Sequence, residues 1–239
     1  MEELSSQRLL DLKTDELLAQ LGGGKHVPGS GSAAALLGLI ACKMMQTVIT
    51  ASRRNLVTGG SLAQLEYIDK MLAERDEPLF REAVQKDAEQ FDQYFQAKEA
   101  AKQKSISEAD RKRLGAIALE KLKPATETPL NIARQAIDTA ERGLLVFDLG
   151  VRHTRGDSGV AVSAALSSCS GALFIVYLNL LRFREGEWAQ KVRSEADGLS
   201  LRYQRLQIEQ FTRTLRIQSE GVTAQPNPQL DLKLPYTDG

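Results

Sequence analysis

Apolar residues recur three or four positions apart along most of the chain, as they do on one face of an α-helix. The sequence contains no alternating run of β-branched residues bounded by hairpin turns. This pattern predicts an all-α fold, a helical bundle of long helices. The expected helices are residues 6–21, 31–51, 60–75, 77–104, 107–122, 126–148, 157–183 and 185–219.

Glycine, proline and polar segments separate these helices. Breaks are expected at residues 22–31, 58–60, 124, 150–156 and 186. The polar segment 99–113 is expected to form a solvated turn between two long helices. We therefore expect one helical domain, residues 1–219, followed by a flexible tail, residues 220–239, which carries three of the seven prolines.

Two segments, residues 31–51 and 159–171, are rich in Gly, Ala and Ser. Small side chains let helix axes approach closely, so these helices should cross at the centre of the bundle or across a subunit interface. Residues 159–181 are also long enough to span a membrane. Because buried helices of large bundles have the same composition, we expect no membrane partner.

Composition narrows the function classes further. The 239 residues include 31 Lys plus Arg and 31 Asp plus Glu, a balance that does not favour nucleic acid as a partner. Cys42 and Cys169 are not in a metal-binding spacing, and two histidines cannot form a histidine-rich metal site. The first 15 residues lack the features of a signal peptide. A cytoplasmic protein without a metal site is expected.

Asp87 interrupts an apolar helical stripe that includes Phe80, Val84, Phe91 and Tyr94. A buried carboxylate must be paired, hydrogen-bonded or held at a raised pKa, because removing water from an isolated charge is costly. Asp87 is therefore a candidate acid or base. The alternative is a salt bridge to an Arg or Lys of a neighbouring helix.

Two glycine-containing loops open into the small-residue helices. In residues 22–32, glycines and a helix N-terminus suit a flat or anionic ligand, although Ser30 or Ser32 could simply be an N-cap. In residues 149–159, Asp157 is expected to be the N-cap of the following helix. Asn179 interrupts a further apolar run, so its amide needs a partner on a neighbouring helix or on a polar ligand.

Four segments together carry a family resemblance. Residues 26–35 resemble the Pro-Gly-Gly-Gly-Ser signature of the formiminotransferase-cyclodeaminase and methenyltetrahydrofolate cyclohydrolase family. Residues 86–91 resemble its Asp-Ala-x-x-Phe helix, Asp157 with Val160-Ala161 resembles its Ser-Asp-x-x-Val-Ala segment, and residues 177–180 resemble its Ile-Asn-Leu segment. Residues 52–54 correspond to a basic segment of the family. The resemblance spans residues 8–215.

The resemblance implies a helical bundle that forms a homodimer, with a folate cleft near the subunit interface. It implies an enzyme that acts on the N5/N10 bridge of tetrahydrofolate, either a methenyltetrahydrofolate cyclohydrolase or a formiminotetrahydrofolate cyclodeaminase, with no cofactor besides its folate substrate. Because the chain has no room for a formiminotransferase domain, the hydrolase is favoured. Asp87 would be the general base or acid. The substrate-binding residues implied are Gly29, Ser30, Gly31, Ser32, Arg53, Arg54, Lys102, Asp157 and Asn179.

Several positions depart from the family pattern. Ser30 replaces the middle glycine of the signature, and Ala101 replaces the proline before Lys102. Val151, Gly156 and Ile175 stand where the family has Asn, Ser and Asn. Each lost hydrogen-bonding partner in a closed site can cost about 1–3 kcal/mol. The alternative is therefore a helical scaffold or regulatory protein that keeps the fold without catalysis.

Overall fold

The computed structural model describes residues 8–55, 59–103, 105–183 and 186–223, and within these ranges every regular element is helical. The prediction of an all-α bundle is confirmed. The α-helices are α1 Thr14–Leu21, α2 Ser30–Arg54, α3 Gly60–Met71, α4 Glu77–Ala101, α5 Glu108–Leu122, α6 Pro124–Leu149, α7 Arg155–Leu180 and α8 Glu187–Thr223. Shorter helical turns are η1 Leu9–Asp11, η2 Leu72–Asp76 and η3 Arg152–Thr154.

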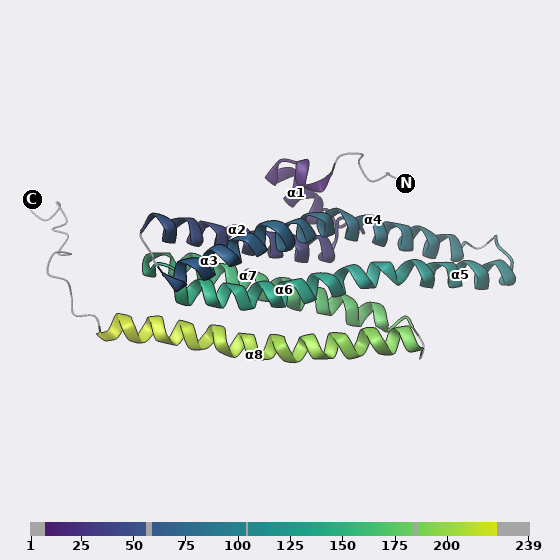
Figure 1. The fold of residues 1–239 in the computed structure, drawn as a ribbon. Helices are drawn as coiled ribbons and strands as arrows, with labels where there is room; N and C mark the ends of the chain where they lie inside the picture. Colours follow the sequence, from purple (N-terminus) through teal and green to yellow (C-terminus); the bar gives the residue numbers. More distant parts are fainter. Residues whose placement is uncertain (1–7, 56–58, 104, 184–185, 224–239) are drawn as a thin grey trace, which may run out of the picture.

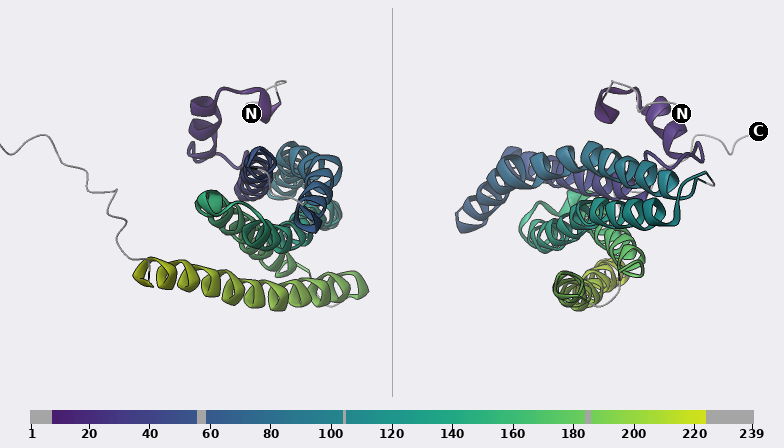
Figure 2. Two further views of the ribbon diagram at one scale, coloured as in Figure 1. Left: turned by 60° about the vertical axis from the view of Figure 1, so that its left-hand side comes forward. Right: turned by 90° about the vertical axis from the view of Figure 1, so that its right-hand side faces the viewer.

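The helices α2, α4, α6 and α7 form the centre of the bundle (Figure 1). The short helix α1 lies on one side of this centre, and the long helix α8 lies on the opposite side (Figure 2). Helix α5 runs back along α4, so that the two form a hairpin projecting from one end (Figure 1). This arrangement leaves the N-terminus of α2 packed against the middle of α4, where Asp87 lies.

The small-residue helices α2 and α7 pack antiparallel to each other. A Cβ atom at Gly171 would lie 3.7 Å from Cβ of Ala34, and the Val151 amide donates to Ser52 Oγ at 3.1 Å near the other end of the pair. Small side chains thus allow the close approach expected from the sequence. The prediction that these helices meet at the centre of the bundle is confirmed within one chain.

The π-helical turn η2 joins α3 to α4 without a break. The sequence predicted two separate helices, 60–75 and 77–104. A π turn adds a residue to one helical turn and so rotates everything that follows relative to the preceding helix. This rotation directs the buried Asp76 toward α6, where three side chains contact it.

Three predictions about helix ends are wrong in detail. Helix α7 begins at Arg155, and its N-cap is Thr154, so Asp157 lies within the first turn. The N-cap of α2 is Gly29, so neither Ser30 nor Ser32 caps that helix. The turn between α4 and α5 is shorter than residues 99–113, because ion pairs such as Lys102–Glu99 and Lys112–Glu108 support polar helix ends.

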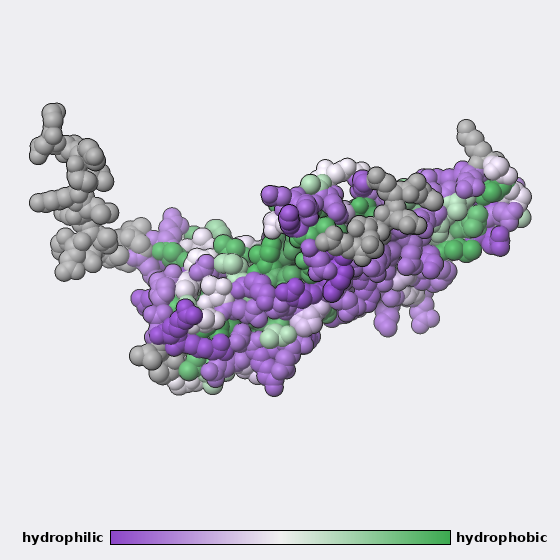
Figure 3. All heavy atoms as spheres, turned by 90° about the horizontal axis from the view of Figure 1, so that it is seen from above, coloured by the Kyte–Doolittle hydropathy of each residue, from purple (hydrophilic) through white to green (hydrophobic). Residues whose placement is uncertain are grey.

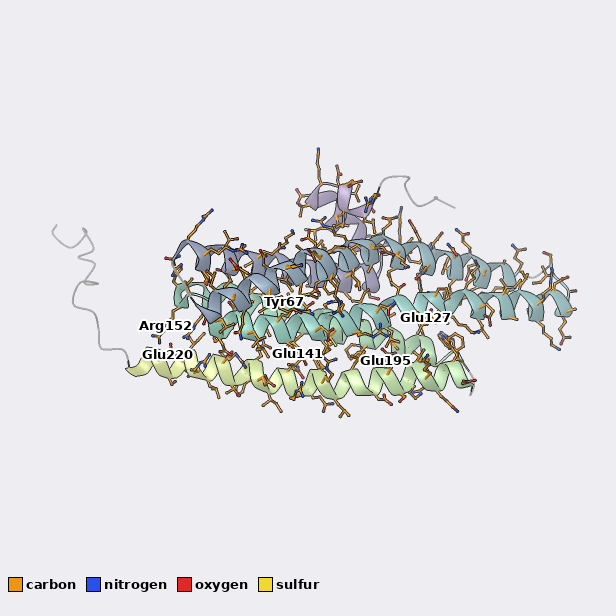
Figure 4. All side chains as sticks on the ribbon, viewed as in Figure 1. Tyr67, Glu127, Glu141, Arg152, Glu195 and Glu220 are labelled. Carbon is orange, nitrogen blue, oxygen red and sulfur yellow. The ribbon has the colours of Figure 1, made fainter. Side chains whose placement is uncertain are left out.

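Helix α8 packs along α6 and α7 with a charged inner edge. Arg205 pairs with Glu141, Glu195 pairs with Arg134, and Glu220 pairs with Arg155 of α7 (Figure 4). Its outer side leaves Leu201, Ile208 and Phe211 exposed. The helix extends to Thr223, beyond the expected domain end at residue 219, and residues 224–239 of the predicted tail lie outside the described residues.

Two helical segments of the described chain, Ser30–Arg54 and Arg152–Leu180, are long and apolar enough to span a membrane. Half of each apolar window is buried inside the bundle, as is usual for core helices of such bundles. The sequence had indicated only the second of these. The apolar surface of the protein is unevenly distributed, and hydrophobic residues gather in the middle of the face shown in Figure 3.

Candidate active site

Asp87 lies on α4 with 6% of its surface exposed, directly against the first turn of α2. A Cβ atom at Gly31 would lie only 2.0 Å from Oδ1 of Asp87, so the glycine is what allows this approach. Ser32 Oγ donates to the Val84 carbonyl oxygen at 2.8 Å and, more weakly, to Oδ2 of Asp87 at 3.5 Å. The carboxylate therefore takes the place of a missing side-chain cap on α2.

Burial raises the pKa of Asp87 to about 6, and the hydrogen bonds from the Ser32 backbone and hydroxyl oppose this effect without cancelling it. No Lys, Arg or His among the described residues forms an ion pair with this carboxylate. A carboxylate with a pKa near neutrality can accept a proton and return it within one reaction cycle.

Asp76 shows what a structural buried carboxylate looks like in the same protein. It is fully buried and accepts hydrogen bonds from Gln135 Nε2 at 2.7 Å, Thr139 Oγ1 at 3.2 Å and Arg142 Nη1 at 2.7 Å. The ion-pair alternative weighed for Asp87 therefore applies to Asp76. Within the described part of the chain, Asp87 lacks the cation that would mark it as structural.

The glycine loop before α2 is fastened to α4. His26 Nε2 lies 2.7 Å from Oδ1 of Asp92, and its ring stacks on Phe95 at a centroid distance of 4.0 Å. Pro28 of the same loop is buried. These contacts fix the approach of the chain to Gly31 and hence the position of the first turn of α2 beside Asp87.

Asn179 lies near the C-terminus of α7 and is 9% exposed. Its side-chain amide donates to the Ala125 carbonyl oxygen of α6 at 3.2 Å, so it has the neighbouring-helix partner that the sequence allowed. It also lines a cavity of about 440 Å³ between α4 and α7. The other lining residues are Phe91, Tyr94, Lys98, Leu178, Leu181 and Arg182.

The chain matches the family described as Formiminotransferase-cyclodeaminase over residues 13–198. It belongs to the formiminotransferase-cyclodeaminase family. A curated relative, a methenyltetrahydrofolate cyclohydrolase from Methylorubrum extorquens, is 28% identical over 193 residues, which cover 77% of this chain and 87% of that protein.

A solved structure shares the fold. The crystal structure of a formiminotetrahydrofolate cyclodeaminase from Thermotoga maritima matches with a TM-score of 0.71 and 18% sequence identity. The match covers 87% of this chain and all of that one. The likeness extends the family assignment to the three-dimensional arrangement of the helices.

The other site residues implied by the family resemblance do not all lie together. Gly31, Ser32 and Asp87 are in contact, Gly29 and Ser30 begin the same helix, and Asn179 lies at the same end of the antiparallel α2–α7 pair. Arg53 and Arg54 lie at the opposite end of α2, about 33 Å along the helix from Gly31.

At that opposite end, Arg53 pairs with Asp69 at 2.8 Å, and Asp157 lies in the first turn of α7. Lys102 ends α4, is exposed and pairs with Glu99 at 2.7 Å, and it does not line the cavity near Asn179. The roles of these residues in substrate binding stay predictions.

The residues that depart from the family pattern also lie at two opposite ends of the bundle. Val151 and Gly156 lie at the end of the bundle that holds Arg53, because the Val151 amide donates to Ser52 Oγ. Ser30, Ala101 and Ile175 lie toward the end that holds Asp87 and Asn179.

Of the residues that line the cavity, the sequence analysis named only Asn179 as a site residue. Phe91 was assigned to the apolar stripe and to the family's Asp-Ala-x-x-Phe helix, Tyr94 only to the stripe, and Lys98 and Arg182 were not considered. Lys98 could have been recognised from the sequence, because its spacing from Asp87 places both residues on one face of the helix. Arg182 could be recognised only once the end of α7 was placed across the cavity from α4. Among the described residues, no group of three or more His, Cys, Asp or Glu side chains is arranged to hold a metal ion.

Proposed function

We propose that this protein is an enzyme that acts on the one-carbon bridge between N5 and N10 of tetrahydrofolate, with Asp87 as its general base and acid. The observation that carries the proposal is a buried carboxylate with no cation partner among the described residues, held against a glycine. Family membership and the cyclohydrolase relative support the choice of substrate.

In the proposed hydrolysis, water attacks the methenyl carbon while Asp87 accepts a proton from it. The resulting tetrahedral carbon then expels N5: the C–N5 bond breaks, the carbonyl of the formyl group forms, and N5 receives a proton. The ionised carboxylate also stabilises the cationic methenyl bridge electrostatically. A pKa of about 6 leaves Asp87 largely ionised at neutral pH and still basic enough to accept a proton.

Cyclohydrolysis is proposed over cyclodeamination because the relative with 28% identity is named a cyclohydrolase, whereas the cyclodeaminase with 18% identity supports the fold alone. A cyclodeaminase could use the same carboxylate to move a proton from N10 to departing ammonia. A scaffold without catalysis is not proposed, because it would have no need to keep an uncompensated carboxylate in its interior.

The test is Asp87→Asn, assayed by the loss of methenyl absorbance. The substitution should lower kcat by about 10²–10⁴-fold, because it removes general base catalysis while preserving shape. Asp110→Asn on α5 is the matched control, since among the described residues the polar partners of that carboxylate are Ser107 and Arg113 on the same helix end. Turnover by Asp87→Asn equal to that of the control would contradict the proposed role.

The distribution of the implied site residues supports a homodimer as part of this proposal. Arg53, Arg54 and Asp157 lie too far from Asp87 to act with it in one chain, about 33 Å along α2 and α7. A second copy could supply them. Exposed apolar side chains on the small-residue helices, Ile40, Val160 and Phe174, give such a dimer a surface on which to form.

A further inference from the structure

The cavity beside Asn179 lies along the same face of α4 as Asp87. Asp87, Phe91, Tyr94 and Lys98 are spaced at i, i+4, i+7 and i+11, and so they lie along one face of α4. From Asp87 to Lys98 this face extends about 16 Å. The last three of these residues line the cavity, which begins one helical turn beyond the carboxylate.

The cavity combines aromatic rings with positive charge. Phe91 and Tyr94 lie with their ring centroids 5.6 Å apart, and Lys98 Nζ lies 5.7 Å from the centroid of the Tyr94 ring. Arg182 lies across the cavity, beyond the end of α7. No Asp or Glu of the described residues lines the cavity.

Neither cation forms an ion pair within the described part of the chain. Most Lys and Arg residues of α4, α6 and α8 pair with carboxylates, but Lys98 and Arg182 pair with none among the described residues. Two uncompensated cations that line one cavity raise its affinity for an anion. Because Lys and Arg bind carboxylates through charge-assisted hydrogen bonds, a ligand with carboxylates at one end suits the cavity.

We infer that this cavity binds the benzoyl-glutamate part of a folate, with Lys98 and Arg182 binding the glutamate carboxylates. The order of groups along α4, namely the acid, two aromatic rings and a cation, matches the order of a reacting bridge, a benzoyl ring and a glutamate in the substrate. Asn179 also lines the cavity, and its side-chain oxygen takes no part in the hydrogen bond to Ala125, which its side-chain nitrogen donates. This inference rests on the proposed function, because it assumes that the reacting bridge lies at Asp87.

The inference changes which cations are expected to select the substrate. Arg53, Arg54 and Lys102, which the family resemblance implied, do not line this cavity. Lys98 and Arg182 would instead favour a folate over the pteroate that lacks glutamate. They would also favour folates with further glutamate residues, since each adds a carboxylate.

The experiment compares the binding of tetrahydrofolate and of tetrahydropteroate, which lacks the glutamate, by calorimetry. Lys98→Gln and Arg182→Gln should each weaken tetrahydrofolate binding about tenfold, which corresponds to one charge-assisted contact. Neither should change tetrahydropteroate binding. The matched controls are Lys112→Gln and Arg113→Gln on α5, where both side chains are exposed.

Turnover measurements on the same variants separate this inference from the proposed function. If the wild type turns over methenyltetrahydrofolate but binds tetrahydrofolate and tetrahydropteroate equally well, the cavity assignment is overturned and the proposed function stands. If Lys98→Gln and Arg182→Gln bind tetrahydrofolate as tightly as the controls, the assignment is also overturned. If the wild type neither binds nor turns over a folate, both proposals are overturned. A raised KM for the folate substrate in Lys98→Gln and Arg182→Gln, with kcat unchanged, supports the assignment.

Discussion

At the residue scale, Asp87 should lower the stability of the fold above pH 6. Its pKa is raised by burial from 3.8 to about 6, so between these values the folded state binds more protons than the unfolded state. The free energy of unfolding therefore falls as the pH rises from about 4 to 6. Above pH 6 it stays lower by the full amount. A shift of this size corresponds to about 3 kcal/mol as an upper value.

Asp87→Asn should remove this cost while keeping an acceptor for the Ser32 amide. We expect the variant to be more stable than the wild type at pH 8 by about 1–3 kcal/mol and nearly equal to it at pH 3.5, measured by denaturant unfolding. A variant that is less stable at pH 8 would mean that the ionised carboxylate contributes more as a cap on α2 than it costs by its burial.

Gly31 and Gly38 provide a second residue-scale prediction, because both glycines of α2 face side chains that a Cβ atom would meet. At Gly31 the atom would meet the movable carboxylate of Asp87, whereas at Gly38 it would lie 2.3 Å from the fully buried ring of Phe80. Gly31→Ala should therefore cost activity with little loss of stability. Gly38→Ala should cost about 1–3 kcal/mol of stability through overpacking.

Thermal unfolding and turnover measured together on both alanine variants check this contrast. Gly198→Ala on α8, where nothing lies within 4 Å of the added atom, is the control for introducing alanine into a helix. If Gly31→Ala retains wild-type turnover, the position of the Asp87 carboxylate does not matter for the reaction.

At the element scale, the last residue of the π turn η2 forms a buried ion pair with α6. Asp76 ends this turn and meets Arg142 on α6 at 2.7 Å, with Gln135 and Thr139 completing its hydrogen bonds. If Asp76 loses its charge, the charge of Arg142 is left without an opposite charge beside it in the interior. Asp76→Asn should therefore destabilise the protein by about 3 kcal/mol.

Asp138→Asn is the control for this prediction, because Asp138 pairs with Arg75 and Arg202 nearer to the surface. Its loss should cost less than about 1 kcal/mol. At a temperature where both variants are folded, the kcat of Asp76→Asn should equal that of the wild type. A lowered kcat with an intact fold would give Asp76 a part in the reaction.

The helices could be predicted from the sequence because apolar spacing reports directly on which face of each helix is buried. Helix ends were less predictable, since the N-terminus of α2 is capped by Asp87 of α4, a residue far away in the sequence. Asp87 itself was detectable because one charge on an apolar stripe breaks a local pattern. Lys98 and Arg182 were not recognised as a pair, because only the folded chain brings α4 and the end of α7 to one cavity.

At the scale of the whole molecule, the implied site residues fall into two groups at opposite ends of the α2–α7 pair. Asp87, Gly31 and Asn179 form one group, and Arg53 and Asp157 belong to the other. A two-fold axis that brings one end of each chain to the opposite end of its partner would complete two equivalent sites, since the same surface of both copies is used. The sequence alone offered no means of seeing this division.

This arrangement predicts complementation between two inactive variants. Asp87→Asn and Asp157→Asn should each lose activity as homodimers, but a heterodimer of the two contains one site in which both residues are native. Random pairing after co-expression should therefore restore about a quarter of wild-type activity per chain, because half of the dimers are mixed and one of their two sites is intact.

A pair of variants from the same end provides the control. Asp87→Asn co-expressed with Gly31→Ala should show no recovery, because the Asp87 end of each chain is damaged in both. Light scattering on the wild type should give twice the chain mass at micromolar concentration. A monomer, or full activity of Asp157→Asn alone, would exclude a site shared between two copies and would leave Asp87 to act with groups of its own chain.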